Sequence, residues 1–194
     1  MPTKYFEEEK IENIKLEDEV LDDYEFVECV FNHCVIENCK LRNCSFSGCT
    51  FMRCRVMNLE AEHSQMKYSQ FIECNIAGVD WSDLLSGAKF AGPISKLSDC
   101  HLKYNTFSGM LLKKFDFSGS EILSSMFAEC DMTESNFQKC KLEKTEFLKC
   151  DIRKCDFREA TGYQINIMEN KLRGARFSYP DVMSLLSVLE IKID

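Results

Sequence analysis

Twelve cysteines are the residues of this chain with the most evident chemical potential, and their spacing is regular. Between Cys29 and Cys54 every fifth residue is a cysteine. Thiols form disulfides, ligate metals or act in redox chemistry, but metal sites favour closely spaced Cys pairs with His partners. The chain has only three histidines, His33, His63 and His101. The spacing therefore predicts thiols that pack as small apolar side chains in a reducing compartment.

Other reactive side chains form no catalytic pattern. The sequence contains no P-loop, nucleophile elbow, HExxH or GxGxxG motif. Most Asp, Glu and Lys residues occupy positions expected to face solvent. We therefore predict a protein that is not an enzyme and that has no catalytic residues, cofactor or metal. A metal or redox role for the thiols is the third and most distant interpretation.

The positions of these side chains follow a sequence repeat of five residues. A large apolar residue, here called a repeat centre, lies two places after each cysteine of the Cys29–Cys54 run. One register extends from Leu16 to Trp81, and a second, shifted by one residue, extends from Leu97 to Phe177. Helices repeat every 3.6 residues and strands every 2.0, so a period of five requires a chain that turns a corner in each repeat, as in a solenoid. The aromatic centres expected in the core are Phe31, Phe51, Phe71, Phe117, Phe137, Phe157 and Phe177.

The repeats resemble those of the pentapeptide-repeat family, whose consensus is Ala-Asp/Asn-Leu-X-X. The run CDMTESNFQKCKLEKTEFLKCDIRKCDFREA carries the resemblance, which covers roughly residues 16–179. It implies an all-β solenoid, a right-handed quadrilateral β-helix with four repeats per coil, in which residues twenty apart stack. We expect this β-helix over residues 1–179 and a capping or dimerisation segment with a short α-helix over residues 180–194.

The two registers meet at residues 82–96. This stretch contains Gly87, Gly92 and Pro93, which favour turns. The simplest interpretation is a coil with a short bulge or loop near Gly92. Whether the loop is a neutral insertion or a contact for a partner stays open. The candidate contact residues are Asp83, Ser86, Lys89, Gly92, Pro93 and Lys96.

The last segment changes its period. Apolar residues after Pro180 follow the i, i+3, i+4, i+7 spacing of a helix. One face would cover the open end of the solenoid, and the remaining apolar surface would suit a two-fold partner. We therefore predict a homodimer, with a monomeric cap as the competing view. The candidate interface residues are Val182, Met183, Leu185, Leu186, Leu189 and Ile191.

Charge is concentrated at the start of the chain. Residues 1–25 hold ten acidic and three basic residues, whereas the net charge of the whole chain is −8. This acidic segment is either a solvated end that prevents solenoids from stacking or a surface that binds a partner. The absence of a basic stripe argues against direct binding of nucleic acid. The absence of a signal sequence and of an apolar run of about 20 residues predicts a cytoplasmic protein without membrane contact.

Within the family, the chain is similar to the Qnr-type group. The similarity lies in KIEN at residues 10–13, in LKYNTFSGMLLKK at residues 102–114, and in the pattern of Tyr179 and the apolar residues that follow it. It implies a dimer that binds DNA gyrase or topoisomerase IV by mimicking DNA and so confers quinolone resistance or toxin protection. The candidate acidic face is Asp116, Asp156 and Glu159. Residues 131–194 nevertheless hold equal numbers of acids and bases. A scaffold for an unrelated partner is the alternative.

Overall fold

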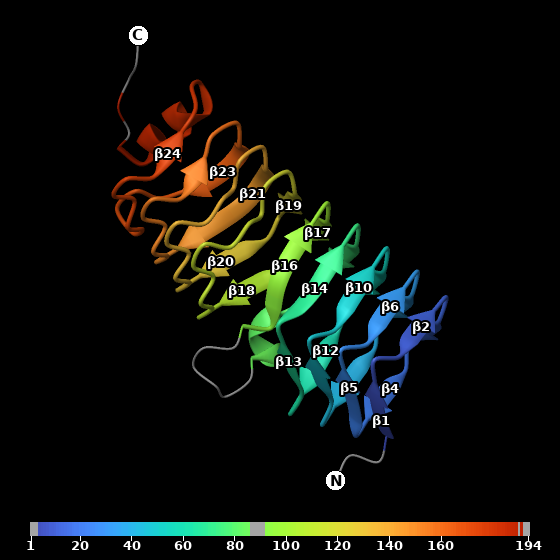
Figure 1. Cartoon of the computed structure of the whole chain (residues 1–194). Coiled ribbons are helices and arrows are strands. Elements are labelled where there is room, and N and C mark those ends of the chain that lie inside the picture. The colour runs from blue at the N-terminus through green and yellow to red at the C-terminus, as the bar shows by residue number, and fades with distance from the viewer. Residues whose placement is uncertain (1–3, 86–91, 190, 192–194) are drawn as a thin grey trace.

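The chain is wound into a rod of parallel β-strands (Figure 1). The computed structural model describes residues 4–85, 92–189 and 191. Each coil has four sides, and in the regular coils each strand pairs with the strand twenty residues further along, as Phe31 does with Phe51 and Phe51 with Phe71. Across the break the spacing is longer, and Phe71 pairs with Leu97. The predicted quadrilateral β-helix is thereby confirmed.

Four faces run along the rod, and each is named here after its first strand. The β1 face has β1 (Lys4–Glu7), β5 (Tyr24–Val27), β9 (Ser45–Ser47) and β13 (Gln65–Lys67). The β2 face has β2 (Lys10–Glu12), β6 (Val30–Asn32), β10 (Thr50–Met52), β14 (Ser69–Ile72) and β16 (Ile94–Ser98), with β22 (Asp156–Phe157) and β24 (Arg176–Phe177) further on. The β3 face has β3 (Lys15–Glu17), β7 (Val35–Glu37), β11 (Arg55–Met57), β15 (Asn75–Ala77), β17 (His101–Lys103) and β19 (Glu121–Leu123). The β4 face has β4 (Val20–Asp22), β8 (Lys40–Arg42), β12 (Glu60–Glu62), the 3-10 helix η1 (Trp81–Leu84), β18 (Thr106–Ser108) and β20 (Met126–Ala128). The strands β21 (Lys141–Leu148) and β23 (Thr161–Ile165) turn the corner between the last two faces.

Each corner is made by one residue in the left-handed conformation. It lies two places after the repeat centre, as Arg53 does after Phe51, and 24 non-glycine residues of the described chain have this positive φ. Its backbone N–H donates to a carbonyl of the next coil, as from Arg53 to Ile72 at 2.9 Å. The corners therefore tie successive coils together as well as changing the direction of the chain.

The repeat centres form ladders along the axis. Phe117, Phe137 and Phe157 stack with ring centroids 4.6 and 4.8 Å apart, and Phe177 continues this column at 5.1 Å. Phe107 and Phe127 belong to the column of the opposite β4 face, in which they stack at 4.6 Å. Rings of the two columns meet edge to face, which is a favourable aromatic geometry. Six of the seven aromatic centres predicted from the period are buried, and the seventh, Phe177, is half-buried and packs against the core.

All twelve cysteines are buried and free. They occupy the small-residue position two places before a repeat centre, and their thiols donate to backbone carbonyls, as Cys54 does to Phe31 of the preceding coil at 3.4 Å. The predicted role of the thiols as small packing groups is confirmed.

We expect these thiols to resist alkylation in the native protein. Burial raises the pKa of Cys49 to about 11 and that of Cys140 and Cys155 to about 12, so thiolate, the reactive form, is scarce at neutral pH. A hydrogen bond with Cys74 lowers the pKa of Cys54, but Cys54 is buried and shielded from reagent. Iodoacetamide followed by mass spectrometry should label few cysteines before denaturant is added and all twelve afterwards. Rapid labelling of several sites in the native protein would contradict the packing role.

One coil departs from the regular register. The period places Ile167 as the centre that stacks on Phe147, but the structure pairs Phe147 with Ile165, so the corner within β23 is two residues shorter than the corner of β21 beside it. Gly162 permits this shortcut, because a Cβ atom there would lie 2.9 Å from the backbone of Glu143. Asn170 then restores the register by accepting from the backbone N–H of Cys150 at 2.8 Å.

The C-terminal segment forms a helix where it was expected, over η2 (Asp181–Leu189), but the helix is of the 3-10 type rather than an α-helix. Hydroxyl groups explain the tighter winding: Ser184 donates to the carbonyl of Asp181 at 2.8 Å, and Ser187 donates to that of Ser184 at 2.7 Å. Such side-chain bonds to a carbonyl three residues back compete with the α-helical pattern.

Candidate interaction surfaces

The break in the repeat lies on the β1 and β2 faces. Leu85 bridges Met66, and the carbonyl of Gly92 accepts from Tyr68 at 3.1 Å. In a regular coil, the residue that bridges the repeat centre of the previous coil is followed directly by the residue whose carbonyl accepts from the corner N–H. Leu85 and Gly92 therefore hold consecutive positions of the coil. A β-bulge at Ser95 adds one further residue before the second register begins. The change from the first register to the second is therefore made by residues 86–91, which come between two consecutive coil positions, and by this bulge.

The six candidate contact residues of the break divide into three groups. Gly92, Pro93 and Lys96 belong to the coil, where the first two give carbonyl acceptors and Lys96 pairs with Gln70 in the sheet. Asp83 lies in η1, where burial and the neighbouring Asp80 raise the pKa of its carboxyl. Ser86 and Lys89 lie outside the described residues. Their role in binding stays a prediction.

The predicted acidic row exists geometrically, but it is short and one of its two carboxylates, Asp156, is paired with an arginine. Asp116, Asn136 and Asp156 stack on successive coils of the β2 face. The Arg158 guanidinium holds the pKa of the Asp156 carboxyl below its ordinary value, with a nitrogen–oxygen distance of 2.6 Å. The next position of the same column is Arg176.

Glu159 lies at a corner of the same face with φ of 60°. Its backbone N–H donates to the Ser178 hydroxyl at 3.0 Å. This residue therefore faces the end of the rod near η2 rather than continuing the Asp116 column.

The β1 face of the C-terminal half is neutralised in the same way. The guanidinium of Arg153 contacts Asp151 at 2.6 Å and lowers the pKa of that carboxyl. Lys113 approaches Asp131 at 3.2 Å, and Lys154 approaches Glu134 at the same distance. Ion pairs at such exposed sites contribute little stability, but they offset the negative charge of Asp131, Glu134 and Asp151 on this face.

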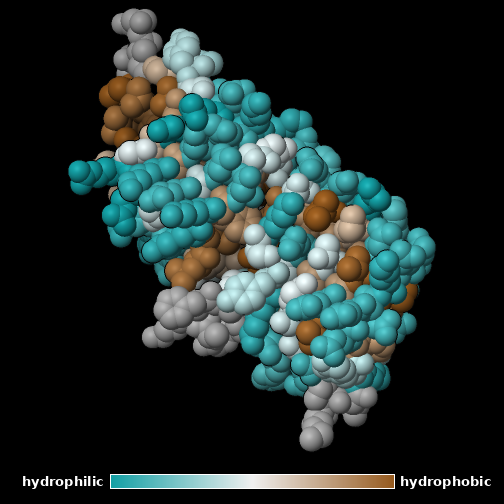
Figure 2. Space-filling model, viewed as in Figure 1, coloured by the Kyte–Doolittle hydropathy of each residue, from teal (hydrophilic) through white to brown (hydrophobic). Residues whose placement is uncertain are grey.

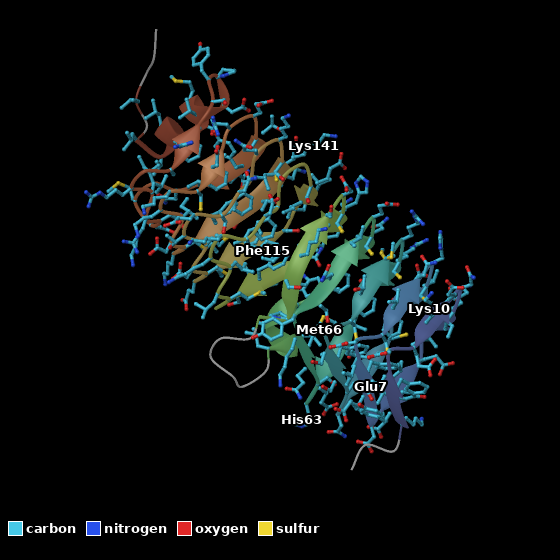
Figure 3. All side chains as sticks on the ribbon, in the orientation of Figure 1. Glu7, Lys10, His63, Met66, Phe115 and Lys141 are labelled. Atoms are coloured by element: carbon cyan, nitrogen blue, oxygen red, sulfur yellow. The ribbon has the colours of Figure 1, made fainter. Side chains whose placement is uncertain are left out.

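Among the described residues, the first coil has few ion pairs, unlike the C-terminal half. It carries most of the acidic residues of the N-terminal segment, and among its described residues the only ion pair is that between Lys15 and Glu17 at 2.8 Å. Amide groups of the second coil serve as further partners: Asn32 donates to Glu12 and Asn38 to Asp18. The labelled Glu7 and Lys10 mark this end of the rod in Figure 3.

The C-terminal end exposes apolar side chains. Figure 2 shows hydrophobic atoms gathered there, beside the grey terminal residues. Of the six predicted interface residues, Leu185 is buried, and Val182 packs against the core. Leu186 is half-buried, whereas Met183, Leu189 and Ile191 are exposed. The segment therefore divides into a capping side and an exposed side.

The described residues contain no group of three or more His, Cys, Asp and Glu side chains arranged to hold a metal ion. Among the same residues, no helix has the length and apolar character needed to cross a membrane.

The sequence did not predict one feature, an apolar cavity along the axis of the first four coils. Its signal is the size of the repeat centres that stack twenty apart: Leu21, Leu41 and Ala61 are smaller than Phe107, Phe127 and Phe147 of the C-terminal half.

Four-sided coils, stacked ladders and left-handed corners define a quadrilateral β-solenoid. The family model described as pentapeptide repeats (8 copies) matches two segments of the chain, residues 25–56 and 127–161. These two segments match the pentapeptide-repeat family, and the coils around them have the same four-sided fold.

Comparison with solved structures finds the same fold in QnrB1, described as a plasmid-mediated fluoroquinolone resistance protein. A trypsin-treated variant of QnrB1 superimposes with a TM-score of 0.67 at 13% identity, covering 95% of this chain and 99% of that one. The full-length form gives a TM-score of 0.52 at 15% identity, covering 96% and 100%. Comparison with curated proteins gives no match.

Proposed function

We propose that this protein is a non-catalytic binding partner of a type II topoisomerase, DNA gyrase or topoisomerase IV, and that binding protects the enzyme from a quinolone or a toxin. The supporting observation is the extent of the fold similarity to QnrB1, which spans 99% of that chain. The sequence similarity around residues 10–13 and 102–114 and in the C-terminal segment points in the same direction.

The charges assign different roles to the two halves in this proposal. Ion pairs neutralise the C-terminal half, so this half contributes shape and the dimer contact. The negative charge that would stand in for DNA phosphates comes from the first coil. A scaffold for an unrelated partner is the second candidate, favoured by the concentration of unpaired acidic residues at one end of the rod.

The proposal is tested by a gyrase supercoiling assay with a fluoroquinolone present. The intact protein should restore supercoiling, with topoisomerase IV decatenation as a parallel assay. No rescue of either enzyme at concentrations up to tens of micromolar would favour the scaffold, and a pull-down would then identify its partner.

Deleting residues 86–91 should abolish this rescue without unfolding the rod. Leu85 and Gly92 hold consecutive coil positions, so the deletion joins two ends that are already neighbours in the coil. Circular dichroism and thermal unfolding should be nearly unchanged. A variant with alternating Gly and Ser over residues 86–91 separates the sequence of this segment from its length. Full rescue by the deletion variant would exclude the segment as a topoisomerase contact.

The dimer in this proposal uses the exposed side of the C-terminal segment. The double variant Leu189→Glu/Ile191→Glu should be monomeric with an unchanged unfolding midpoint, because both side chains are exposed. Leu185→Glu is the matched control and should lower stability, because Leu185 is buried against the coil. Light scattering measures the mass. An unchanged mass for the double variant, and for a chain that lacks residues 180–194, would remove the dimer from the proposal.

A further inference from the structure

An apolar cavity of about 250 Å³ runs along the axis of the first four coils. Its walls are repeat centres of successive coils, beginning with Phe6 and ending with Trp81 and Leu84. Three coil-to-coil steps of about 4.8 Å place Trp81 about 14 Å from the first coil. The cavity is therefore long and narrow, with the shape of a linear chain.

Side-chain size explains why the axis is hollow here and filled further on. In the C-terminal half, phenylalanines of the opposite β2 and β4 faces meet edge to face across the axis, as Phe127 and Phe137 do with centroids 5.9 Å apart. In the first three coils the β4 face instead carries the smaller centres Leu21, Leu41 and Ala61. The cavity ends at Trp81, whose indole stacks on Phe107 at 6.0 Å.

The first coil forms an open mouth. Phe6 is 37% exposed, whereas Phe26, which stacks on it, is 5% exposed. Exposed Ile14 also lines the cavity. Glu9 and Glu19 occupy the small-residue position of this coil, one coil before the buried Cys29 and Cys39. Both side chains are exposed and belong to the coil that forms the mouth, so two carboxylates lie near the opening of the channel without lining it.

We infer that this channel binds a cationic amphiphile, a linear alkyl chain with an ammonium head. Apolar cavities of about 150 Å³ stay dry and accept apolar ligands, so a larger apolar cavity suits an alkyl chain. The acidic rim selects a positive head group. It also disfavours a second copy of the chain at this end, because residues 1–25 hold ten acids and three bases, and like charges would face each other.

The test uses the chain's single tryptophan, Trp81, as a reporter at the inner end of the cavity. Dodecylammonium with bromine on its terminal carbon should quench Trp81 fluorescence, whereas bromine next to the head group should not. Dodecanoate, with the same chain and a negative head, should bind at least about tenfold more weakly. Equal quenching by the two bromine positions, no quenching at all, or tighter binding of dodecanoate would each overturn the inference.

Two variants locate the contacts. Val56→Phe narrows the cavity with a residue that serves as repeat centre elsewhere in the rod, and it should abolish binding while the circular dichroism spectrum is retained. Glu9→Gln/Glu19→Gln should reduce the preference for dodecylammonium over dodecanoate without abolishing chain binding. If dodecylammonium instead lowered the mass of an end-to-end assembly in light scattering, a second copy would be the occupant and the inference would fail.

Discussion

Replacing Phe137 with alanine is expected to lower the free energy of unfolding by about 3–5 kcal/mol. The ring is fully buried and lies between Phe117 and Phe157, with centroids 4.6 and 4.8 Å away. Its removal takes away both stacking contacts within the column and leaves a cavity that two hydrogen-bonded coils cannot close. Urea unfolding followed by circular dichroism measures the loss.

Phe6→Ala is the matched control, because Phe6 is a repeat centre at the open end and is already 37% exposed. Its cost should be clearly smaller, since less apolar surface is lost from the core. In a solenoid each coil contacts only its neighbours, so Trp81 fluorescence reports whether the N-terminal half unfolds together with the coil that contains Phe137. Equal costs for the two substitutions would show that stacking in the C-terminal ladder adds nothing.

Replacing Gly162 with alanine is expected to be the most damaging of the glycine substitutions, at about 2–5 kcal/mol. The residue has φ of 72°, and an added Cβ would lie 2.9 Å from the backbone nitrogen and Cα of Glu143. Backbone atoms cannot move aside without breaking the hydrogen bonds of β21. The shortened corner would therefore open, and the pairing of Phe147 with Ile165 would be lost.

Gly119→Ala measures the cost of the left-handed conformation alone, without a steric clash of the added Cβ. Gly119 also has positive φ, 71°, but an added Cβ would meet nothing within 4 Å. Its cost should be only about 1–2 kcal/mol, the penalty for a left-handed residue with a side chain. Thermal unfolding of both variants gives the comparison. Similar losses for the two glycines would mean that the close approach to Glu143 is unimportant.

The period of the sequence determined the fold class and most of the core. A centre in every fifth residue and coils of twenty residues place Phe137 between Phe117 and Phe157 without any knowledge of coordinates. The same arithmetic assigned Cys54 and the other cysteines to the inward small position. These features were predictable because each depends on a local repeat that the next coil copies.

Only the tertiary structure decided the places where one coil differs from the next. The sequence favours Ile167 as the partner of Phe147, but the shortcut at Gly162 depends on how closely the Glu143 backbone approaches. The adjacency of Leu85 and Gly92 likewise depends on which carbonyl Tyr68 reaches. Contacts between coils, rather than residue preferences, choose between such registers.

The surfaces also divide into features that the sequence determines and features that only the structure decides. The sequence by itself determined that carboxylates gather in the first coil and that apolar residues gather at the C-terminus. Only the structure decided that Arg158 neutralises Asp156, that Leu185 faces the core while Leu189 faces outward, and that an apolar channel opens among the acids. The physical reason is that charge pairing, exposure and cavity volume depend on distances between coils, which a one-dimensional period does not contain.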